Sequence, residues 1–81
     1  MPMVISAYTL IRTENSKREK LVDKIKKLRF VKDVVLVYGE YDIVVKTETD
    51  SIEELNFFTY NELRKIRGLT ATTTMITFRK K

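Results

Sequence analysis

The chain has 81 residues, with 16 Lys and Arg against 11 Asp and Glu and a formal net charge of +5 at pH 7. This length predicts one small domain, which removes only about 60 to 65% of the unfolded surface from water and gains from a partner surface. The chain has no Cys and no His, which excludes disulfides, thiolate nucleophiles and the commonest metal ligand and general base. Most hydrolase, zinc and redox functions are thereby removed, and we expect no cofactor, no metal site and no enzyme activity.

Neither a targeting segment nor a membrane span is indicated. The N-terminal stretch MPMVISAYTLIR lacks the charged opening and long apolar segment of a secretory signal, and no apolar run approaches the ~18 to 20 residues that cross a bilayer. A cytoplasmic location without membrane contact is expected.

The positive charge is concentrated in one segment, because residues 16–30 carry seven Lys or Arg and two Asp or Glu, and 7 − 2 = +5. A solvated, ion-pairing helix face of a heat-adapted protein fits this pattern.

A strand and a basic helix are predicted first. Residues 3–12 are rich in β-branched and aromatic side chains, which favour a strand. Ser16 and Glu19 have the spacing of a capping box, in which each side chain satisfies a backbone N–H at the start of a helix. The helix has one apolar stripe, which consists of Leu21, Val22, Ile25 and Leu28.

A β-hairpin follows. Residues 34–38 and 41–48 are joined by Gly39 and Glu40, and glycine as the first of two loop residues suits a type II′ turn. Such a loop fixes the strand register. One face then pairs Tyr38 with Tyr41, Leu36 with Ile43 and Val34 with Val45, and the other pairs Val37 with Asp42, Val35 with Val44 and Asp33 with Lys46.

A second helix and a last strand complete the chain. Ser51 and Glu54 form another capping box, and the helix ends at Gly68. The last strand covers about residues 70–78. The order βαββαβ with right-handed crossovers predicts a four-stranded antiparallel sheet with both helices on one face, an α+β ferredoxin-like sandwich. The core face of the second helix is predicted to consist of Ile52, Leu55, Leu63 and Ile66.

The sheet face without helices is expected to be apolar. Two copies that pack face to face would bury it, so we expect a dimer as the minimum unit. Phe57, roughly opposite the core stripe of its helix, adds to the apolar surface. The predicted dimer interface includes Val35, Val37, Val44 and Met75.

Three segments carry a family resemblance: VYGEYDIVVKTE, SIEELNFFTYNELRKIRGL and TATTTMITF. Together they resemble the C-terminal effector domain of the Lrp/AsnC (feast/famine) transcription regulators, called RAM for regulation of amino-acid metabolism. The resemblance implies the same fold, of the dimeric α/β barrel type. It also implies dimers that pack through their sheets, rings of four dimers, and small effectors, typically amino acids, bound between dimers.

The chain is expected to differ from the family in lacking a DNA-binding domain. Because Met1 lies two residues from the first strand, a helix-turn-helix domain has no room, and we expect a stand-alone RAM domain without direct DNA contact. Such a domain would act by effector-dependent assembly or by joining full-length Lrp/AsnC regulators.

An effector site is expected around the glycine loop. The ammonium of a free amino acid needs an anionic acceptor, and its carboxylate needs N–H or O–H donors. Asp42 could accept from the ammonium, and the backbone at Gly39 could donate to the carboxylate because no Cβ obstructs its approach. The resemblance implies an effector-binding set of Tyr38, Gly39, Glu40, Tyr41, Asp42, Thr72, Thr73 and Thr74.

Purely structural roles for these residues stay open. Gly39 suits the turn, Asp42 suits a hydrogen bond beside the turn, and paired tyrosines or runs of threonine stabilise strands.

Two other functions of the protein also stay open. The basic helix could bind nucleic acid with a steep salt dependence, although YDIVVKTE lacks the exposed aromatic pattern of an RNA-recognition strand. An enzyme would have to use Asp42, a tyrosine or a lysine, and their spacing indicates no catalytic pair.

Overall fold

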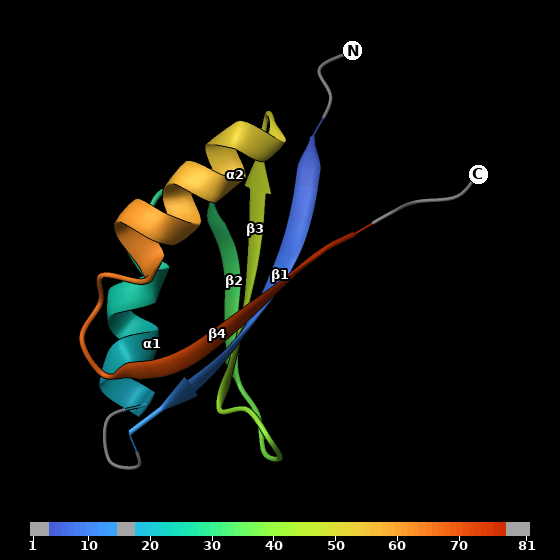
Figure 1. The fold of residues 1–81 in the computed structure, drawn as a ribbon. Helices are drawn as coiled ribbons and strands as arrows, with labels where there is room; N and C mark the ends of the chain where they lie inside the picture. Colours follow the sequence, from blue (N-terminus) through green and yellow to red (C-terminus); the bar gives the residue numbers. More distant parts are fainter. Residues whose placement is uncertain (1–3, 15–17, 78–81) are drawn as a thin grey trace.

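A computed structural model describes residues 4–14 and 18–77. The elements are β1 (Ile5–Thr13), α1 (Arg18–Lys26), β2 (Val31–Leu36), β3 (Ile43–Thr49), α2 (Ile52–Phe58), the π-helical turn η1 (Thr59–Leu63) and β4 (Leu69–Ile76). All strand pairs are antiparallel in one four-stranded sheet with the order β2-β3-β1-β4. Both helices lie on the same side of this sheet (Figure 1). The predicted ferredoxin-like sandwich is confirmed.

The core lies between the helices and the sheet. Burial alternates residue by residue along β1 and β3, as the two-residue period of a strand requires. Phe58 is fully buried and meets Phe30 edge to face, with ring centroids 5.8 Å apart. The buried cluster consists of Ile11, Leu21, Ile25, Val34, Ile43, Val45, Phe58 and Leu63. Neither α1 nor α2 has the length and apolar character that crossing a bilayer requires.

The second helix departs from its predicted course. Ser51 caps it as expected, with its Oγ accepting from the Glu54 N–H at 3.1 Å, but the Glu54 carboxylate accepts from the Asp50 N–H instead of completing a capping box. The α-helix ends at Phe58, and in η1 the Arg64 N–H donates to the Thr59 carbonyl, five residues back. The change from four- to five-residue hydrogen bonds thus begins directly after the buried Phe58.

The predicted core stripe of this helix is correct only in its middle. Leu55 and Leu63 are buried and Ile66 is half-buried, whereas Ile52 is 47% exposed. Ile52 is the first residue of α2, at the edge of the sandwich where β3 passes into the helix (Figure 1). The other predicted capping box includes Ser16, which lies outside the described residues.

The hairpin register is confirmed, but its turn is not. Asp33 pairs with Lys46, Val35 with Val44 and Leu36 with Ile43, as predicted. The strands nevertheless end at Leu36 and begin again at Ile43, and beyond them the Val37 N–H donates to the Asp42 carbonyl at 2.9 Å. Gly39 has φ +136°, far from the value of about +60° at the first central residue of a type II′ turn. Residues 37–42 therefore form a wider loop.

An ion pair joins the two helical regions. The Arg29 Nη2 lies 2.8 Å from a carboxylate oxygen of Glu62, and its Nε donates to the same oxygen at 3.0 Å. This hydrogen bond raises the pKa of the Arg29 guanidinium above its ordinary value. The contact ties the segment after α1 to η1.

The uncovered sheet face carries two rows of side chains across all four strands. Direct pairing places Val35, Val44, Leu10 and Thr73 in one row and Asp33, Lys46, Tyr8 and Met75 in the next. Val35 is 44% and Met75 49% exposed, and Phe57 on α2 is also exposed, as predicted. Three of the four predicted interface residues, Val35, Val44 and Met75, thus stand on this face.

Candidate functional site

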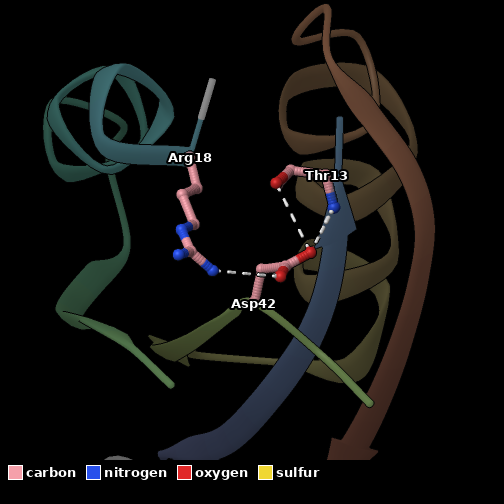
Figure 2. Close-up of polar contacts among 3 residues, drawn as sticks. All are labelled: Thr13, Arg18 and Asp42. Carbon is pink, nitrogen blue, oxygen red and sulfur yellow. Dashed lines mark hydrogen bonds and ion pairs between the residues drawn. The ribbon is translucent and has the colours of Figure 1, made fainter. Parts of the chain in front are cut away.

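Asp42 stands where the 37–42 loop returns to the sheet. Its backbone N–H donates to the Ile11 carbonyl at 2.8 Å, which holds it against β1. Its Oδ2 accepts from the Thr13 N–H at 2.8 Å and lies 3.4 Å from the Thr13 Oγ1 (Figure 2). Hydrogen bonds to the end of β1 therefore orient the carboxylate. Asp42 thus has a structural role, because it joins the loop to β1.

The other carboxylate oxygen of Asp42 faces a cation. The Arg18 Nη1 lies 3.6 Å from Oδ1, at the first residue of α1 (Figure 2). The Arg18 and Asp42 side chains are 38% and 28% exposed, so water screens this pair and its contribution to stability is below about 1 kcal/mol. A second cationic group could replace the guanidinium here at little cost.

The two tyrosines of the loop separate instead of pairing. Tyr41 lies with its Oη 3.4 Å from the Thr73 Oγ1, and the Arg12 guanidinium carbon is 5.3 Å from its ring centroid. Tyr38 is 94% exposed, and its ring centroid is 5.6 Å from the Arg18 guanidinium carbon. Because the strand ladder ends before the loop, the predicted Tyr38–Tyr41 pair does not form, and each ring contacts a different arginine.

Gly39 and Glu40 lie at the exposed tip of this loop. A Cβ at Gly39 would meet no atom within 4 Å, so the glycine is required there by its positive φ and not by a close neighbour of its own chain. The backbone of the loop tip is thus open to approach from outside.

The three predicted threonines lie on two different faces of β4. Thr73 is opposite Leu10 on the uncovered face, whereas Thr72 and Thr74 are opposite Ile11 and Thr9 on the helix side. The Thr74 Oγ1 lies 3.1 Å from the Thr9 Oγ1. One chain therefore presents these hydroxyls to two surfaces, with Thr73 beside Tyr41 and the other two beneath α2.

Thr72 and Thr74 line a groove of about 280 Å³ between the helical layer and β4. The Arg64 guanidinium carbon lies 5.1 Å from the Tyr60 ring centroid at its rim, and a guanidinium suits a carboxylate ligand. Asp42 does not line this groove. Sequence patterns did not indicate several of the lining residues, and the spacing of four between Tyr60 and Arg64 was their only signal. The full lining is Leu55, Asn56, Thr59, Tyr60, Arg64, Thr72, Thr74 and Ile76.

Comparisons with known proteins identify relatives. The profile of the Lrp/AsnC ligand binding domain matches residues 6–81. An uncharacterized HTH-type transcriptional regulator of Pyrococcus horikoshii is 32% identical over 76 residues, which cover 90% of this chain and 51% of the relative. The chain thus spans about half the length of the curated relatives that it matches.

Solved structures share the fold. A hypothetical protein of Pyrococcus horikoshii has 34% identity and a TM-score of 0.86, with 94% of this chain and 92% of that chain covered. A transcriptional regulator of Neisseria meningitidis, solved in complex with L-Met, has a TM-score of 0.84 over 94% of this chain and 51% of that chain. Its 15% identity shows a shared fold alone.

Proposed function

Because this chain belongs to the family of Lrp/AsnC ligand binding domains, we propose that it is a regulatory module that binds an amino acid between copies of itself. The relatives are transcriptional regulators, which is consistent with a domain that senses and does not catalyse. The Neisseria regulator of the same fold binds L-Met, which supports an amino acid as the class of effector.

The main support for this proposal comes from the contacts of the two Asp42 carboxylate oxygens. One oxygen is fixed by the Thr13 N–H at 2.8 Å, and the other has the guanidinium of Arg18 at 3.6 Å. A carboxylate that is already oriented and already attracts a cation suits the ammonium of an amino acid. In our proposal this ammonium displaces Arg18, and the backbone at Gly39 and Glu40 binds the carboxylate, with Tyr38 and Tyr41 at the sides.

The threonines support a site that needs more than one chain. Thr72 and Thr74 line the groove under α2, whereas Asp42 binds β1 on the side away from β4. Two strand spacings, about 10 Å, separate β3 from β4, so Asp42 and the Thr72 and Thr74 hydroxyls face different surfaces of one chain. Thr73 lies beside the loop, with its Oγ1 3.4 Å from the Tyr41 Oη. We propose that the loop of one copy and the hydroxyls of Thr72, Thr73 or Thr74 of another complete the site.

Assembly follows from the uncovered face. Val35, Val44 and Met75, with Val37 at the edge, form the dimer interface in this proposal, because exposed apolar residues on a sheet face lose contact with water when two sheets pack. Dimers would join in a ring, and full-length Lrp/AsnC regulators could enter through the same face. The effector would stabilise one assembly by mass action.

Asp42→Asn tests the site. Asn keeps an oxygen that can accept from the Thr13 N–H but carries no charge for an ammonium, so the fold should persist. Titration calorimetry with the twenty amino acids should find one that binds the unchanged protein and binds the variant at least about tenfold more weakly. Asp50→Asn, an exposed aspartate at the start of α2, is the matched control. Equal affinity in Asp42→Asn and the unchanged protein would remove Asp42 from the site.

A further inference from the structure

A second groove, beside α1, gathers cations from two segments of the chain. Lys20 and Lys24 lie one helical turn apart on α1, and Arg67 lies in the segment between η1 and β4. This segment passes beside α1 before β4 begins (Figure 1). The groove has a volume of about 470 Å³, against about 280 Å³ for the groove under α2. It lies away from the proposed effector residues, none of which lines it.

Packing fixes the floor of this groove. Gly68 has φ +104°, and a Cβ there would lie 3.1 Å from the Cδ1 of Leu21, which is buried. The Glu14 N–H donates to the Gly68 carbonyl at 3.1 Å, which joins the end of β1 to the same segment. The hollow is therefore formed by the fold before any ligand enters.

The described residues that line this groove carry a net positive charge. Within residues 4–14 and 18–77 the ion pairs are Arg18 with Asp42 and Arg29 with Glu62, and neither includes a cation of this groove. Among residues 4–14 and 18–77 the lining contains three cations and one acid, Glu14, which together leave +2. Like charges four residues apart destabilise a helix, and cations around a hollow raise its potential. An anionic ligand would relieve both effects.

We propose that this groove binds a small oligophosphate, such as inorganic pyrophosphate or the diphosphate end of a nucleotide. Lys20 and Lys24 would contact it from one wall and Arg67 from the other, and both side-chain types bind phosphate oxygens through charged N–H donors. Cations on two walls suit a ligand with two linked phosphates better than a single phosphate. None of the described lining residues is an aromatic on which a base could stack, which disfavours single-stranded nucleic acid.

Titration calorimetry with pyrophosphate at constant ionic strength tests the proposal on the full chain. We expect saturable binding that is stronger than binding of orthophosphate or sulfate. Lys24→Ala and Arg67→Ala should each weaken it by about tenfold, because each removes a charged hydrogen bond. Lys26→Ala removes the same charge from the same helix outside the groove and should leave the affinity within about twofold.

Glu14→Gln provides a test in the opposite direction. It removes the one negative charge of the lining, so pyrophosphate should bind a few-fold more tightly, about threefold. A gain of affinity does not arise from damage to the fold.

Three results would overturn the proposal. Pyrophosphate and sulfate could bind equally weakly, or Lys26→Ala could lose as much affinity as Lys24→Ala. The third is that a single-stranded oligonucleotide binds and pyrophosphate does not. None of these results depends on whether an amino acid binds near Asp42.

Discussion

The two faces of the sheet differ in what their side chains contact. On the helix side, Ile11, Ile43 and Val45 are completely buried, and even the threonines among them are excluded from water. On the other side, Val35 and Met75 keep nearly half of their surface exposed, although their strands, β2 and β4, pair directly with β3 and β1. The helix side holds the core of a single chain, although Leu36 and Ile76 on its edge strands are 45% and 48% exposed. The other side carries exposed Val35 and Met75 beside the polar Asp33, Lys46 and Thr73, and no described element covers it. The comparison separates residues that fold the chain from residues available to a partner.

Two adjacent phenylalanines test this distinction most strongly. Phe58→Ala removes a fully buried ring from the core and should lower the free energy of unfolding by about 3 to 5 kcal/mol. Phe57→Ala, at a position 55% exposed, should change it by no more than about 0.5 kcal/mol in a single chain. Chemical denaturation measures both. A large loss in Phe57→Ala would instead mean that a second copy covers this side of α2.

The next prediction concerns two neighbours on β2 with almost equal exposure, Val35 at 44% and Leu36 at 45%. Val35→Asp places an unpaired charge on the uncovered face and should weaken dimers at least about a hundredfold. Leu36→Asp places the same charge on the opposite face and should leave the dimer intact. Sedimentation velocity distinguishes the two. If Val35→Asp remained a dimer, face-to-face packing of the sheets would be wrong.

The smallest effect is expected on the buried face. The Thr47 Oγ1 is buried and has no hydrogen-bond partner among the described residues. Thr47→Val replaces the hydroxyl by a methyl group of nearly the same shape, so the variant should gain about 1 kcal/mol of stability. A thermal melt measures the gain. A loss of stability would indicate that the hydroxyl has a partner in the assembled protein.

The sequence predicts most of this fold because its signals are local. The short loop after Tyr38 predicts the register of Val35 with Val44, and the Ser51 cap starts α2 where expected. The end of that helix could not be predicted, because the shift to five-residue hydrogen bonds at Thr59 reflects the packing of Phe58 against Phe30. Tertiary contacts decided this segment.

The sequence names candidate residues for the effector site, but it does not give their geometry. The family resemblance pointed to Asp42 and to the threonines of the last strand. It could not indicate that the Thr13 N–H and Arg18 already contact the carboxylate of Asp42, since these contacts join residues far apart in the sequence. Nor did the run of threonines reveal that strand alternation sends Thr73 to one face and Thr72 and Thr74 to the other.

Light scattering in line with size-exclusion chromatography, with and without each of the twenty amino acids, shows whether an amino acid controls the assembly of this chain. We expect a mass of at least two chains of 9.6 kDa and a change in assembly size with one or a few amino acids. Asp42→Asn should abolish this change without altering the fold. A 9.6 kDa monomer that ignores all twenty amino acids would contradict both the uncovered face as an interface and Asp42 as the ammonium acceptor.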